Sequence, residues 1–117
     1  MKPTDRKYTL YLEDMLISME RIGEYIGDLD FIHFKQNSMI VDAVIRNFEI
    51  IGEASKYIPD DVIKNHPHLP WKKMYSLRNM VTHEYFGIDY EVIWEIAKGE
   101  LPQNIVDLRQ LIELEKN

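Results

Sequence analysis

The stretch PWKKMYSLRNMVTHEYFG, residues 70–87, sets the terms for the rest of the chain. A proline suits the first helical turn and a glycine commonly follows the last, so the pattern predicts one amphipathic helix. At about 100° per residue, its apolar side chains fall on one core-facing stripe: Met74, Leu77, Met80 and Val81. The polar face gathers Arg78, Asn79 and His83. A solvated surface does not require that combination, so it is the first indication of chemistry.

Arg78 and His83 are five residues apart, which on an ideal helix means about 140° and about 7.5 Å of rise. Asn79 lies four residues before His83 and can fix the orientation and tautomer of the imidazole. A permanently cationic Arg and a His that titrates near neutral pH together suit a phosphodiester. Arg holds the charge that grows on the phosphoryl oxygens, and His moves the proton of the attacking hydroxyl. A plain solvated helix face has the same spacing and is the alternative.

Length and composition indicate one globular domain spanning residues 1–117. Only 5 Gly and 5 Pro interrupt the long periodic runs, which favours helices. With no Cys, neither a disulfide framework nor a thiolate metal site is possible, and a reducing compartment fits. The first residues lack an apolar signal segment, and no apolar run approaches the ~18 residues that span a bilayer. A soluble, cytoplasmic protein is expected.

The net charge of −6 argues against a protein that coats nucleic acid, because phosphate binding draws its affinity from surplus Lys and Arg. A small basic cleft remains compatible with that charge. Lys72 and Lys73, beside Arg78 and Arg46, are the candidates to bind RNA in such a cleft.

Helices are expected on both sides of this stretch. The first follows Thr4 as N-cap and ends near Gly27, and a short turn follows at residues 31–34. The second long helix covers residues 38–58, with Ser38 as its cap and Pro59 after its end. Asp60 begins another short turn.

A last helix starts at Asp89 and is kinked or broken by Gly99 and Pro102, before residues 103–115 complete the chain. The sum is an all-α fold, an antiparallel bundle of about four to five helices, with Trp71 and Trp94 near its ends.

The predicted helix at 38–58 is apolar on more than one side, which is typical of a central helix or of one in a subunit interface. Gly52 has no side chain and would therefore allow another helix to approach closely. The charged residues keep to a narrow strip: Asp42, Arg46, Glu49, Glu53 and Lys56. This strip has two interpretations. It is either a solvent-exposed row of charges, or Arg46 and Glu53 contact and orient the residues of the Arg78/His83 site.

His66 and His68 form an H-x-H pair between prolines, in a predicted loop. A metal site would need further ligands, and no helical E-x-x-H or H-x-x-x-H pair supplies them. No metal is expected there.

Four segments occur in a defined order: RNFEIIGEASK at 46–56, PW at 70–71, LRNMVTHEYFG at 77–87 and DYEVIW at 89–94. Together they resemble the HepT-like toxins of the HEPN superfamily over roughly residues 5–115. The family motif R-x4-H-x-Y is matched by Arg78, His83 and Tyr85.

The resemblance implies a homodimeric, all-helical ribonuclease that needs no metal or other cofactor, with Arg and His of both protomers lining a cleft at the dimer interface. It also implies the toxin half of a type VII-like toxin–antitoxin pair. The partner would be a minimal nucleotidyltransferase of the MntA type, which inactivates the toxin by transferring AMP from ATP to the motif tyrosine, here Tyr85.

The mechanism expected is transesterification of RNA. His83, oriented by Asn79, takes the proton of the ribose 2′-hydroxyl, Arg78 stabilises the phosphorane, and a 2′,3′-cyclic phosphate results. Two rival hypotheses stay open: a non-catalytic subunit that binds the nucleotidyltransferase, and a bare helical dimerisation module. The intact set of Arg78, Asn79, His83 and Tyr85 favours the enzyme.

Overall fold

The computed structural model describes residues 6–83 and 89–116, and for residues 79–83 it describes the backbone alone. The described residues form helices and their connections, with no strand among them, which confirms an all-α fold. Along the chain the elements are α1 (Tyr8–Ile26), α2 (Phe31–Gln36), α3 (Ser38–Ser55), α4 (Asp60–Asn65), α5 (Trp71–His83), α6 (Tyr90–Glu95), the π-helix η3 (Ile96–Glu100) and α7 (Leu101–Lys116).

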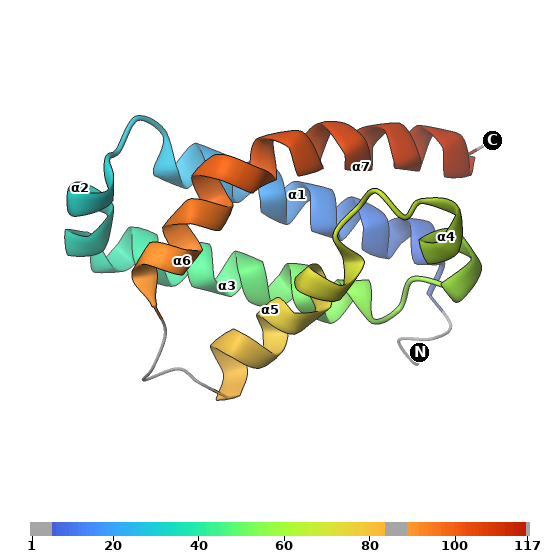
Figure 1. The fold of residues 1–117 in the computed structure, drawn as a ribbon, viewed down its shortest axis with the longest axis horizontal. Coiled ribbons are helices and arrows are strands. Elements are labelled where there is room, and N and C mark those ends of the chain that lie inside the picture. Colours follow the sequence, from blue (N-terminus) through green and yellow to red (C-terminus); the bar gives the residue numbers. More distant parts are fainter. Residues whose placement is uncertain (1–5, 84–88, 117) are drawn as a thin grey trace.

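The long helices run antiparallel to their neighbours (Figure 1). Helix α1 packs between α3 and α7, and α5 packs on the other side of α3. The apolar stripes that the sequence places at spacings of three and four meet in one core, whose fully enclosed side chains include Leu12, Met15, Met19, Ile22, Val44, Phe48, Ile51, Ile93 and Leu108. The antiparallel bundle predicted from the sequence is therefore confirmed.

The N-cap of helix α3 lies one residue earlier than predicted. The side-chain oxygen of Asn37 accepts a hydrogen bond from the Ile40 backbone N–H at 3.1 Å, so Asn37 is the N-cap and Ser38 is the first helical residue. Asn satisfies a free N–H at a helix start as well as Ser does, and here its backbone is extended as a cap requires. Similarly, α1 begins at Tyr8, and Thr4, the predicted cap, lies outside the described residues.

The last part of the chain bends without breaking. Asp89 caps α6 as predicted, because its carboxylate accepts from the Glu91 N–H at 2.9 Å. Helix α6 then passes through η3 directly into α7, and Figure 1 shows the three as one bent path. A π-helical turn widens the backbone locally, and Pro102 follows it as the second residue of α7.

The two tryptophans are held differently. Trp94 packs against α2, with ring centroids 5.2 Å from Phe34 and 6.1 Å from Phe31. Trp71 is buried at the start of α5, and its Nε1 donates to the His66 carbonyl at 2.8 Å. This bond ties the first turn of α5 to the loop after α4.

A polar cluster anchors the same loop to both termini of the described chain. The Tyr8 hydroxyl donates to Glu115 at 2.6 Å, and His66 Nε2 lies 3.3 Å from the other oxygen of that carboxylate. The hydrogen bond from Tyr8, together with the neighbouring His66, holds the pKa of Glu115 below its usual value. His66 is thus engaged by Glu115, and no set of three or more His, Asp or Glu side chains in the described ranges is placed to hold a metal ion.

None of the helices in the described ranges combines the length and the apolar character needed to cross a bilayer.

The position of the α3 cap can be tested with a pair of neighbouring substitutions. Asn37→Ala removes the acceptor for the Ile40 N–H and should lower the free energy of unfolding by about 1 kcal/mol, measured by urea denaturation followed by circular dichroism. Ser38→Ala, one residue along, should leave that free energy nearly unchanged. A larger loss in Ser38→Ala than in Asn37→Ala would restore Ser38 as the cap.

Candidate active site

The site forms where α5 crosses α3 at Gly52. A Cβ atom built on Gly52 would lie 2.6 Å from the backbone nitrogen of Arg78 and 2.7 Å from its Cβ. No other residue type fits that space, so glycine allows the two helices to touch at the level of Arg78. The prediction that Gly52 admits a second helix is confirmed, and the residue it admits is the predicted catalytic arginine.

This contact brings Arg78 onto the carboxylate of Glu53, the residue that follows Gly52. Arg78 Nε and Glu53 Oε2 are 2.5 Å apart, and the other oxygen of Glu53 lies 3.3 Å from Lys56 Nζ. The Arg78 and Glu53 side chains are 33% and 44% exposed, so the pair contributes little to folding stability. Its effect is to orient the guanidinium, whose terminal nitrogens are suited to a phosphate.

Arg78 and Glu53 open into a pocket of about 420 Å³ between α1, α3 and α5. Its lining comprises Tyr11, Asp14, Arg46, Glu49, Ile50, Glu53, Ala54, Tyr57 and Arg78. Arg46 is mostly exposed and pairs with Glu49 at 2.7 Å. The structure therefore brings three of the predicted site residues, Arg46, Glu53 and Arg78, into one place.

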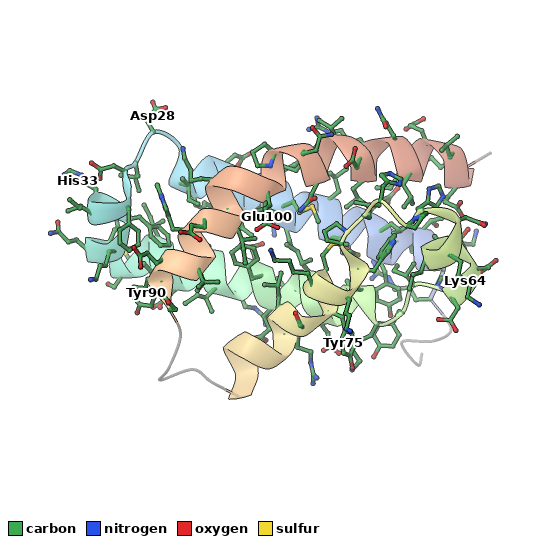
Figure 2. The ribbon with its side chains drawn as sticks, viewed as in Figure 1. Asp28, His33, Lys64, Tyr75, Tyr90 and Glu100 are labelled. Atoms are coloured by element: carbon green, nitrogen blue, oxygen red, sulfur yellow. The ribbon has the colours of Figure 1, made fainter. Side chains whose placement is uncertain are left out.

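The two lysines predicted to bind RNA lie beside different parts of the structure. Lys73 Nζ lies 2.6 Å from a carboxylate oxygen of Glu100 in η3, so it is engaged within the bundle. Lys72 lines a different pocket, together with Tyr75. In the view of Figure 2, Glu100 and Tyr75 lie on opposite sides of α5. Adjacent residues on a helix are about 100° apart, which is why the two lysines meet different neighbours.

The other half of the predicted site is only partly described. The backbone of α5 continues as a helix to His83, so Arg78, Asn79 and His83 share one uninterrupted element. The side chains of Asn79 and His83, and the whole of Tyr85, lie outside the described residues. Their roles stay predictions.

Two tyrosines at the edge of the site were not predicted. The rings of Tyr11 and Tyr57 stack with centroids 4.8 Å apart, and the Arg6 guanidinium lies 4.5 Å from the centroid of the Tyr11 ring. Arg6 in turn pairs with Asp14 at 2.6 Å. This group closes the pocket on the side of α1. The only signal in the sequence is that Tyr57 lies four residues after Glu53, one helical turn along.

With this geometry in place, comparison with known proteins gives consistent matches. The family model described as "Ribonuclease HepT-like" matches residues 15–113. "Putative RNase MJ1380" of Methanocaldococcus jannaschii is 46% identical over 98 residues, which cover 84% of this chain and 90% of that protein. "Probable ribonuclease HepT" of Thermococcus cleftensis is 41% identical over 97 residues, or 83% of this chain and 88% of its own. No solved structure matches the chain.

The contact at Gly52 can be tested with a matched pair of glycines. Gly52→Ala places a methyl group against the Arg78 backbone and should lower the free energy of unfolding by about 1–3 kcal/mol, because α5 must move away from α3. Gly23→Ala, in α1, meets nothing within 4 Å and should raise that free energy by about 0.5–1 kcal/mol. Thermal and urea unfolding measure both. Equal gains in the two variants would contradict the close approach.

Proposed function

The chain belongs to the HepT-like ribonuclease family, and we propose that it is the toxin of a toxin–antitoxin pair, a cytoplasmic endoribonuclease that cleaves RNA through its own 2′-hydroxyl. The activity class, a ribonuclease, follows from the family. The observation that supports this particular chemistry is Arg78, fixed by Glu53 at the mouth of a pocket, five residues before His83 on the same helix.

In the proposed reaction, the His83 imidazole removes the proton of a ribose 2′-hydroxyl, and the 2′-oxygen attacks the adjacent phosphorus. The bond from phosphorus to the 5′-oxygen breaks, and that oxygen takes up the proton that His83 removed, delivered by the imidazolium directly or through water. The products are a 2′,3′-cyclic phosphate and a 5′-hydroxyl. Arg78 stabilises the negative charge of the pentacoordinate state, and Asn79 orients His83. The atoms balance with RNA and these side chains alone, so the proposal includes no metal or cofactor.

Glu53 and Arg46 act in this scheme as positioning residues. Glu53 contacts Arg78 at Nε. This contact orients the guanidinium and leaves its two terminal nitrogens to bind a phosphate. Arg46 and Glu49 line the same pocket as an ion pair. When RNA enters, a phosphate can replace the Glu49 carboxylate as the partner of Arg46. A site whose arginines are held in ion pairs before substrate arrives is pre-oriented for an anion.

We also propose that the active form is a homodimer. Arg78 and His83 are five residues apart on one continuous helix, a spacing of about 140° around its axis, and the proposal therefore takes the two groups at one phosphate from different copies. The outer face of α3 carries Met39, which is 82% exposed, and Ile50, which lines the Arg78 pocket. These residues lie on one helical stripe with Arg46, as expected of a face that meets another copy.

The proposed partner is a nucleotidyltransferase antitoxin of the MntA type. The phenol oxygen of Tyr85 would attack the α-phosphorus of ATP, pyrophosphate would leave, and AMP would remain attached. Tyr85 lies two residues after His83. An added nucleotide there would carry negative charge toward Arg78 and occupy the space that RNA needs, which accounts for inhibition.

Substitutions on α5 test the reaction. Arg78→Ala and His83→Ala should each slow cleavage of single-stranded RNA by at least about 10²-fold, because each removes transition-state stabilisation or proton transfer. Arg109→Ala, an exposed arginine paired with Glu20 elsewhere, is the matched control and should cleave normally. Rates are read on gels, and mass spectrometry identifies the cyclic phosphate. Wild-type cleavage by His83→Ala would favour the non-catalytic binding subunit instead.

Modification is tested by intact mass. Co-expression with the nucleotidyltransferase of a neighbouring gene, with ATP, should add one or more AMP units to the wild type and none to Tyr85→Phe. Tyr90→Phe, which changes an exposed tyrosine on α6, should be modified like the wild type. An unmodified wild-type mass in the presence of active antitoxin and ATP would remove Tyr85 from the proposal.

A further inference from the structure

A second pocket, of about 520 Å³, lies next to the Arg78 pocket and is not used by the mechanism above. It is formed by the end of α3, by α4 and by the first turns of α5, and its lining comprises Ser55, Lys56, Ile58, Asp60, Ile63, Trp71, Lys72 and Tyr75. Glu53 joins the two pockets, because its carboxylate contacts Arg78 in the first and Lys56 in the second.

The two pockets differ in charge. The Arg78 pocket sets three carboxylates, those of Asp14, Glu49 and Glu53, against two arginines. The second pocket sets two lysines against Asp60 alone. Within the described part of the chain Lys72 has no ion-pair partner, and Lys56 is paired with Glu53 at 3.3 Å. In an acidic protein, this is a locally cationic surface next to the predicted cleavage site, which suits the phosphate of a polyanion.

The second pocket also offers aromatic surface. Tyr75 is 45% exposed and makes no hydrogen bond within the described ranges, and Figure 2 shows it on the outer side of α5. Trp71 is buried and its Nε1 is already bound to the His66 carbonyl, so its ring forms a fixed wall. An exposed aromatic ring next to a lysine is the surface on which unpaired nucleic-acid bases stack.

The position of Tyr75 relates this surface to the reaction. Tyr75 precedes Arg78 by three residues, so the two side chains lie one turn apart on α5, separated by about 4.5 Å of rise and about 60°. The nucleotide adjoining a phosphate at Arg78 is therefore within reach of the Tyr75 ring.

We propose that this second pocket is the binding site for a nucleotide of single-stranded RNA next to the cleaved phosphate. Tyr75 stacks on the base, and Lys72 and Lys56 contact its phosphate. The inference rests on the proposed ribonuclease function. Because every base has a stacking face, the site selects unpaired RNA over duplex RNA and distinguishes weakly between bases.

The test measures binding and cleavage separately. The binding probe is a short fluorescein-labelled uridine RNA with 2′-O-methyl groups, which lacks the attacking hydroxyl. By fluorescence anisotropy, Tyr75→Ala should raise the Kd about tenfold, whereas Tyr75→Phe, which keeps the ring, should stay within about twofold. Lys72→Ala should weaken binding and reduce the slope of log Kd against log salt by about 0.7. Tyr25→Ala on α1 and Lys35→Ala on α2 change comparable exposed side chains elsewhere and should bind normally.

Cleavage of unmodified RNA separates this inference from the proposed function. Tyr75→Ala should raise KM and keep kcat, because the reacting groups are untouched. If the wild type cleaves and Tyr75→Ala keeps both its Kd and its KM, the second pocket is not a nucleotide site, although the ribonuclease proposal stands. If the wild type binds the probe without cleaving RNA, the proposed ribonuclease function is wrong. The inference that the second pocket binds the nucleotide next to a cleaved phosphate is then wrong as well. Conversion of Tyr75→Ala to a monomer in light scattering would instead assign this face to an interface between copies.

Discussion

Helix α5 lies against α3 at Gly52, where even a methyl group would be 2.6 Å from the backbone nitrogen of Arg78. The rest of the site depends on this contact. It brings Arg78 to the carboxylate of the next residue in α3, Glu53, and sets the level at which the two pockets open on either side of that pair. It also makes α5 a poor candidate for sliding, because backbone packed on backbone has no flexible side chain to absorb a shift. The orientation of the arginine is therefore a property of the bundle as much as of the arginine itself.

A protein with a net negative charge that acts on a polyanion needs its positive side chains concentrated at the binding site. Here the arginines of the Arg78 pocket are all balanced by carboxylates, so that surface is neutral to acidic until a phosphate displaces one of them. Two further cations, Lys72 and Lys56, lie in the second pocket. This arrangement suits an enzyme that holds RNA weakly along its length and interacts strongly at one phosphate. General affinity would come from the lysines of the second pocket and selectivity from the oriented arginine.

Much of this architecture could be predicted from the sequence because it depends on local periodicity. The long helices, the cap at Asp89 and the admission of a second helix at Gly52 follow from spacing along one helix. The pairing of Glu53 with Arg78 joins two helices, and the sequence leaves it as one of two interpretations of the charged strip. What could not be predicted depends on which helix faces which. Lys72 and Lys73 are neighbours in sequence, but α4 lies beside one and Glu100 of η3 meets the other. Likewise, the Tyr11–Tyr57 stack joins α1 to the turn that follows α3, and no local pattern in the sequence specifies that contact.

The same rigidity that orients Arg78 limits what one copy of the chain can do. Helix α5 packs on α3 and stays helical through His83, and positions five residues apart on a helix are separated by about 140°. The proposed reaction needs an arginine and a histidine at one phosphorus atom, which this spacing does not favour within one copy. A flexible loop could solve this within one chain, at the expense of the preorganisation that makes the arginine effective. In the proposed dimer this is solved without moving α5, because a twofold axis along this face would bring the arginine of one copy near the histidine of the other. The proposed dimer is thus the arrangement that reconciles a rigid helix with a two-residue reaction.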